Sequence, residues 1–160
     1  MTRQHIRWFA PAVLESVERE RNRVLDRLTE WDVQVNTKTS DTIALLVADR
    51  VRDAIRYSRT AQITLTLEVT GRELRFQAIN HDPSESGAGE QQGRRDRTLL
   101  TLLATDWGEF QPTGSGMGVW FLLALPDPLT ARRRTLLTRV RQARPRQVVH
   151  RFSGRSDSAA

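Results

Sequence analysis

Residues 40–58 read SDTIALLVADRVRDAIRYS, and this stretch decides the fold. Its apolar side chains recur at steps of three or four residues, the spacing of one face of an α-helix: Ile43, Leu46, Val47, Val51, Ala54 and Ile55. Ser40 or Asp41 is expected to cap the first turn, because either side chain can accept a hydrogen bond from an amide that has no partner inside the helix. The stretch therefore predicts a long amphipathic helix that packs its apolar face on the rest of the domain.

Two aspartates lie beside this apolar stripe. Asp49 and Asp53 are four residues apart, so both carboxylates project from the same side of the helix. Such a pair can bind a metal ion or serve in acid–base chemistry. Alternatively, both are surface acids that pair with Arg52 and Arg56, each three residues further on. The helix taken alone favours the ion pairs, because exposed pairs at this spacing are common.

The other segments alternate between strand and helix patterns. Apolar and polar residues alternate in 62–69 and 73–79, and Gly71 lies in the turn between them, which predicts a β-hairpin. Pro11 is expected to open a helix over 12–31. Further expected elements are strands at 4–9, 109–111 and 119–125 and a helix at 98–105. The predicted fold class is α/β (α+β): a two-layer sandwich with helices on one face of a mixed four- to five-stranded sheet, plus a basic C-terminal helix.

The positive charge is concentrated at the C-terminal end. Residues 127–160 hold nine arginines and two aspartates, although the whole chain of 160 residues carries a formal net charge of only +6. We therefore divide the chain into a domain at 1–126 and an arginine-rich helix and tail at 127–160. Residues 127–155 are a candidate nucleic-acid-binding segment, because arginines neutralise phosphates. The alternatives are a solvated helix that docks on the domain through its leucines, and a helix that lies on an anionic membrane surface.

The composition excludes several kinds of site. The chain has no cysteine, so disulfides, thiol nucleophiles and thiolate metal sites are ruled out. Its three histidines are scattered, which argues against a histidine metal cluster. No apolar run is long enough for a transmembrane segment, and the N-terminus has no apolar signal region, so we expect a cytoplasmic protein.

Several segments, taken in order, resemble the GHKL (histidine kinase-like, Bergerat-fold) ATPases, and most closely their anti-sigma-factor serine kinase branch. The family pattern has a helix such as SELVTNAVRHS, a hairpin that ends in V-x-D-x-DP, a glycine-rich GRGL lid, ALADRWG, and a G-x-G-K-T-V-W turn. The corresponding segments here are ADRVRDAIRYS (48–58), AINHDP (78–83), LLATDWG (102–108) and GSGMGVWF (114–121). The likeness covers about residues 10–125.

The resemblance implies ATP and Mg²⁺ as cofactors and assigns roles by position. Asp49 stands at the catalytic glutamate, Asp53 at the asparagine that holds Mg²⁺, and Asn80 at the aspartate that accepts from the adenine amino group. The lid and the final turn supply further cofactor-binding positions: Gly93, Arg94, Arg95, Arg97, Gly114 and Gly116.

The helix, adenine and lid positions all depart from the family pattern. The carboxylate of Asp49 is one methylene shorter than that of glutamate, and a misplacement on the order of 1 Å can cost about a hundredfold in rate. Asp53 adds a second negative charge near the phosphates, and Asn80 is a neutral and weaker acceptor. The lid reads RRDR, so it lacks the glycines that permit close backbone approach to the phosphates, and Asp96 adds a negative charge. The three arginines of the lid can bind phosphates instead.

Three functions follow as hypotheses. The first, which we favour, is a regulatory pseudokinase that keeps the fold, binds a sigma factor or an anti-sigma antagonist in transcription regulation, and has weakened or lost ATP binding. The resemblance also implies a homodimer through residues 4–31. The second is an active, divergent ATP-dependent serine/threonine kinase with Asp49 as the base and Asp53 on Mg²⁺. The third is nucleic-acid binding through the arginine-rich tail.

Overall fold

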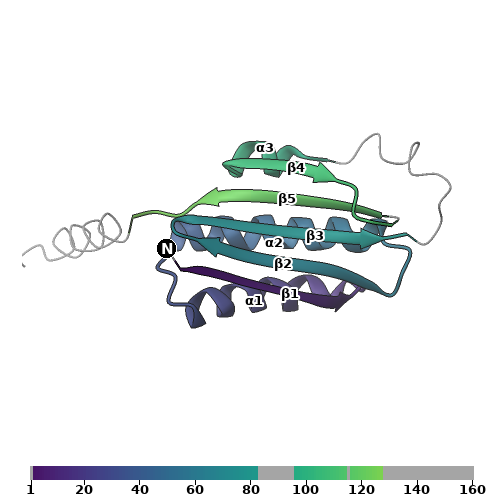
Figure 1. Ribbon diagram of the computed structural model, residues 1–160, viewed down its shortest axis with the longest axis horizontal. Coiled ribbons are helices and arrows are strands. Elements are labelled where there is room, and N and C mark those ends of the chain that lie inside the picture. The colour runs from purple at the N-terminus through teal and green to yellow at the C-terminus, as the bar shows by residue number, and fades with distance from the viewer. Residues whose placement is uncertain (1, 83–95, 115, 128–160) are drawn as a thin grey trace, which may run out of the picture.

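In the described residues the fold is a five-stranded sheet with helices on one of its faces (Figure 1). The computed structural model describes residues 2–82, 96–114 and 116–127. The strands lie in the order β1-β2-β3-β5-β4. Along the chain the elements are β1 (Arg3–Pro11), α1 (Glu15–Glu30), α2 (Thr37–Tyr57), β2 (Gln62–Thr70), β3 (Glu73–His81), α3 (Thr98–Leu103), β4 (Asp106–Phe110) and β5 (Gly116–Ala124).

The predicted class, helices packed on one face of a sheet, is confirmed, but the sheet is not mixed. Each pair of neighbouring described strands is antiparallel. Between β1 and β2 the cause is the pair of helices that connects them, because α1 brings the chain back along the sheet and α2 carries it forward again. The chain therefore enters β2 in the direction opposite to β1, whereas a single crossover helix would have made the two strands parallel.

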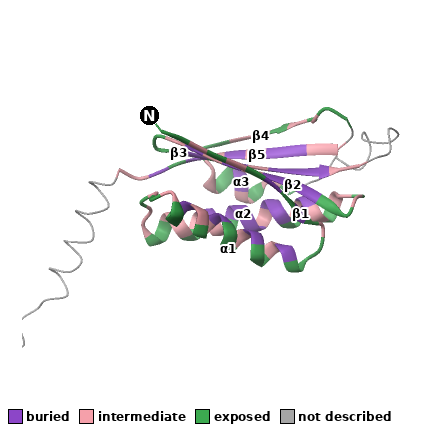
Figure 2. Ribbon diagram, turned by 60° about the horizontal axis from the view of Figure 1, so that its bottom comes forward, coloured by how far each residue is buried: buried purple, intermediate pink, exposed green. Residues whose placement is uncertain are grey.

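The core lies between the helices and the sheet face that they cover (Figure 2). The predicted apolar stripe of α2 is confirmed, because its members from Ile43 to Ala54 are buried. Alternate residues of the central strands meet that stripe, among them Leu65 and Leu67 of β2 and Phe76 of β3. Burying one large aliphatic or aromatic side chain stabilises a fold by about 1.5–3 kcal/mol, so this layer fixes α2 against the sheet.

The predicted start of α2 is wrong by a few residues. The helix begins at Thr37, before both Ser40 and Asp41. Its cap is Asn36, whose side-chain oxygen accepts a hydrogen bond of 2.8 Å from the backbone amide of Thr39. Asparagine, serine and aspartate cap helices about equally well, so residue type does not distinguish Asn36 from Ser40 and Asp41. Asn36 is the cap because it has the extended backbone conformation of a residue that precedes the first helical turn.

Strand β1 lies at one edge of the sheet and anchors α1. Pro11 ends this strand and does not open a helix, and α1 begins at Glu15. A proline is tolerated there because an edge strand needs amide partners on one side only. The Trp8 indole nitrogen donates a hydrogen bond of 2.7 Å to the carboxylate of Glu20, which is 2% exposed. The Arg23 guanidinium lies 5.2 Å from the Trp8 ring centre, so the indole has a polar and a cationic partner, both from α1.

Two further predictions concern segments outside the sheet. The basic helix expected after residue 127 lies outside the described residues, and so does the nucleic-acid-binding role assigned to it. In the part of the chain that the structure describes, no helix is both long and apolar enough to span a membrane.

Candidate functional site

The two aspartates of α2 share a buried guanidinium. Asp49 and Asp53 are half-buried, with 24% and 16% of their side chains exposed, and Arg50 lies between them with a side chain only 1% exposed. Arg50 Nη2 is 2.6 Å from Asp49 Oδ2, and its Nη1 is 3.4 Å from Asp53 Oδ2. The Arg50 Nε also donates to Asp49 Oδ2, at 3.1 Å. The pair of carboxylates therefore surrounds a cation supplied by the same helix.

The two aspartates form ion pairs, as predicted, but not with the predicted partners Arg52 and Arg56. Arg52 and Arg56 are exposed and form no ion pair with either aspartate in the described structure. Arg56 instead lies 5.8 Å from the ring centre of Tyr57. The reason is position on the helix: an arginine on the buried face cannot reach water, so it takes the nearest carboxylates.

A second arginine extends this network to two other elements. Arg97, at the N-terminal end of α3, places Nη1 3.2 Å from Asp53 Oδ2. Its Nε donates to Glu109 Oε1 of β4 at 2.6 Å. Arg97 is 11% exposed, so these bonds are partly shielded from water. The resemblance places Arg97 among phosphate ligands, whereas in the structure it joins α2, α3 and β4.

Asn80 lies near the end of β3 and is 5% exposed. Its Nδ2 donates a hydrogen bond of 2.9 Å to the carbonyl oxygen of Tyr57, the last residue of α2. The structure thus brings Asn80 to the C-terminal end of the helix that carries Asp49 and Asp53. This bond uses the amide nitrogen to close the C-terminal turn of α2 and does not involve the side-chain oxygen, the atom predicted to accept from adenine.

The two glycines predicted in the final turn differ in their surroundings. Gly114 and Gly116 both have positive φ, of 104° and 126°. A Cβ on Gly116 would lie 2.2 Å from the backbone oxygen of Asn80, whereas nothing lies within 4 Å of a Cβ on Gly114. Gly116 is therefore required by close strand packing and by its backbone conformation, and Gly114 by its conformation alone.

The lid positions are only partly described. Gly93, Arg94 and Arg95 lie outside the described residues. The side chain of Asp96 accepts a hydrogen bond of 2.8 Å from the backbone amide of Thr98, in the first turn of α3. Its hydrogen bonds to Thr98 lower the pKa of this carboxyl below its usual value of 3.8. The carboxylate of Asp96, which would repel a phosphate, is thus hydrogen-bonded to the first turn of α3.

In the described residues, the carboxylate to which the resemblance assigns Mg²⁺ already has cationic partners. Arg50 and Arg97 both contact Asp53 Oδ2, so a cation on that oxygen would compete with two guanidinium groups. No group of three or more His, Asp or Glu side chains in the described ranges could hold a metal ion. Two guanidinium groups thus contact the carboxylate to which the resemblance assigns Mg²⁺.

Sequence reasoning missed Arg50 and Glu109. The signal for Arg50 was present, because it lies four residues after Leu46 and four before Ala54, on the stripe itself. It also stands where the quoted family pattern has leucine. Glu109 gave no signal, since its partner Arg97 lies 12 residues away in a different element.

Comparison with known proteins adds no relative: no family model and no curated protein matches this chain.

Proposed function

We propose that this protein is a regulator of the anti-sigma-factor type, which acts by binding a protein partner and has weakened or lost nucleotide binding. The partner proposed is a sigma factor or an anti-sigma antagonist, and the proposed form is a homodimer through residues 4–31. One observation carries the loss of nucleotide use: the buried guanidinium of Arg50 contacts the carboxylates of both Asp49 and Asp53.

The charge balance around this arginine supports the proposal. A kinase needs Asp49 to accept a proton and Asp53 to bind Mg²⁺, and both tasks compete with an arginine tethered within the same turn of helix. Breaking a buried ion pair by removing one partner typically costs about 3–5 kcal/mol, because the remaining charge stays desolvated. Mg²⁺ and nucleotide would therefore compete with contacts that already stabilise both carboxylates. The active kinase is therefore the less supported alternative.

Titration calorimetry with ATP and ADP, each with and without Mg²⁺, tests this proposal. We expect no magnesium-dependent heat at millimolar nucleotide. Asp53→Ala and Asn80→Ala are the matched variants, since they remove the two side chains that the resemblance places on Mg²⁺ and adenine. Magnesium-dependent binding by the native chain that both variants abolish would overturn the proposed loss of nucleotide binding and revive the kinase alternative, whose next test is a search for a phosphoacceptor.

A further inference from the structure

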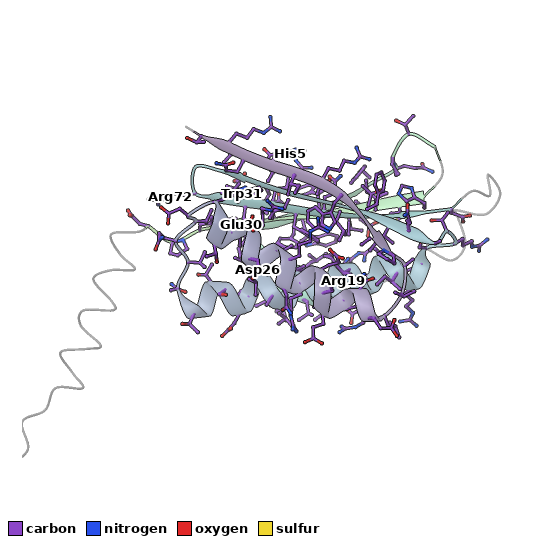
Figure 3. All side chains as sticks on the ribbon, turned by 90° about the horizontal axis from the view of Figure 1, so that it is seen from below. His5, Arg19, Asp26, Glu30, Trp31 and Arg72 are labelled. Atoms are coloured by element: carbon purple, nitrogen blue, oxygen red, sulfur yellow. The ribbon has the colours of Figure 1, made fainter. Side chains whose placement is uncertain are left out.

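The sheet face opposite the helices carries a polar cavity. It has a volume of about 230 Å³ and spans β1, β2 and β3. Figure 3 shows one lining residue, His5, on β1, and the labelled α1 residues Arg19 and Asp26 on the helical side. The cavity is lined by His5, Arg7, Thr66, Glu68, Arg75 and Gln77.

The charges around this cavity favour an anionic ligand. Glu68, the one carboxylate among the described residues that line the cavity, is paired with Arg3 at 2.9 Å. Arg7 and Arg75 form no ion pair in the described structure, and Arg75 lies 4.8 Å from the ring centre of Trp120. Two guanidinium groups without carboxylate partners therefore face one cavity. A ligand that brings carboxylates would neutralise both.

The free edge of β1 adjoins this cavity. In the described structure β1 pairs with β2 alone, so along its nine residues the other edge offers backbone amides and carbonyls that no strand uses. The side chains that β1 places on the outer face are basic over most of its length: Arg3, His5 and Arg7. A second copy of β1 on this edge would bring like charges opposite one another, which is unfavourable, so a homodimer through residues 4–31 would use α1 and leave the edge of β1 open. An acidic strand on the edge would bring opposite charges together.

Apolar side chains at the end of β1 are also left exposed. Phe9 is 63% exposed on the outer face, and Val13 and Leu14, in the connection to α1, are 46% and 70% exposed. A docking segment that follows β1 would reach this apolar end after passing the basic residues.

We infer that the edge of β1 binds an extended acidic segment of the partner protein, which pairs with the strand through its backbone and directs its acidic side chains toward His5 and Arg7. The opposite side chains of that segment are apolar and continue the inner row formed by Ile6 and Trp8. This inference rests on the proposed function in one respect, since it names the chemistry of the protein partner. It does not depend on whether the chain binds nucleotide.

The test uses the full chain and a synthetic peptide as long as β1, in which glutamate alternates with valine. Fluorescence anisotropy of a labelled peptide should show saturable binding that weakens as salt is added. Arg7→Glu should weaken binding by about tenfold, the effect of replacing an attractive cross-strand charge pair by a repulsive one. Arg52→Glu is the matched control, because it reverses an exposed arginine on α2 that forms no ion pair; it should leave binding unchanged.

Two altered peptides separate edge pairing from simple charge attraction. A peptide with lysine in place of glutamate should not bind. A glutamate peptide methylated on the alternate backbone nitrogens that would face β1 should also lose binding, because it cannot donate to the strand. Equal binding of either altered peptide, or of Arg7→Glu, would overturn the inference. Such a result would leave the nucleotide titration, and with it the proposed function, standing.

Discussion

Nη2 of Arg50 lies 2.6 Å from Oδ2 of its sequence neighbour Asp49, and the arginine side chain is 1% exposed. The guanidinium is therefore held on the buried side of α2 by a carboxylate of its own helix, and Asp53 completes its surroundings at 3.4 Å. In the folded chain, the carboxylates of Asp49 and Asp53 therefore surround the buried guanidinium of Arg50.

Replacing Arg50 by leucine should leave Asp49 without its buried cationic partner and remove one of the guanidinium groups that contact Asp53. We expect the free energy of unfolding to fall by about 3 kcal/mol, the lower end of the cost of breaking a buried ion pair, because Asp49 and Asp53 keep some contact with water. Millimolar Mg²⁺ should then raise the melting temperature of Arg50→Leu and leave that of the native chain unchanged. Differential scanning calorimetry with and without Mg²⁺ measures both effects.

Arg52→Leu serves as the control for that experiment, because Arg52 is exposed on the same helix. Its substitution should change stability by less than about 0.5 kcal/mol and create no response to Mg²⁺. An equal response of the native chain and Arg50→Leu to Mg²⁺ would show that Arg50 does not take the place of a metal ion.

The buried bond between Trp8 and Glu20 should be worth more to stability than any exposed charge on α1. Glu20→Ala leaves the Trp8 indole N–H without its 2.7 Å acceptor, and we expect a loss of about 2 kcal/mol in urea unfolding. Glu15→Ala, an exposed glutamate at the start of the same helix, should cost less than about 0.5 kcal/mol. Similar losses in the two variants would mean that the hydrogen bond does not anchor α1 to β1.

The two glycines of the final turn should respond very differently to alanine. Gly116→Ala meets both a positive φ and the backbone oxygen of Asn80 at 2.2 Å, so we expect a loss of about 3 kcal/mol or more. Gly114→Ala meets the conformational cost alone, on the order of 1 kcal/mol. Thermal unfolding of the two variants decides this, and equal losses would exclude the close approach at Gly116.

The pair formed by Arg3 and Glu68 should make stability depend on pH in the acid range. The hydrogen bond from Arg3 is the main cause that lowers the pKa of Glu68 below its ordinary value of 4.5. A lowered pKa in the folded state means that the stabilisation is fully present above pH 4.5 and disappears as the pH falls through the folded-state pKa.

Glu68→Gln isolates that contribution. The native chain should be slightly more stable than the variant at neutral pH, because a largely exposed pair contributes little to stability. This difference should shrink when unfolding is repeated at decreasing pH below 4.5. A difference that stays constant across this range would show that the ion pair does not stabilise the fold.

Local periodicity carried most of the fold prediction. Residues close together in the sequence are enough to identify the apolar stripe of α2, the helical pattern of α1 and the hairpin of β2 and β3. These elements could therefore be predicted without knowing what they pack against. Helix ends were less predictable. Ser40 and Asp41 were as suitable as Asn36 by residue type, and the path of the chain into α2 selected Asn36.

Spacing along a single element was enough to predict that α2 is amphipathic and that Asp49 and Asp53 lie on one side of it. The order of helix and strand patterns along the chain predicted helices on one face of a sheet. Which charges meet was settled by tertiary packing. Asp53 reaches Arg97, 44 positions away, because α3 packs beside α2. Arg50 pairs with both aspartates because the folded chain buries its side chain away from water. An ion pair depends on distance and desolvation, and both are fixed by the packing of elements that lie far apart in the sequence.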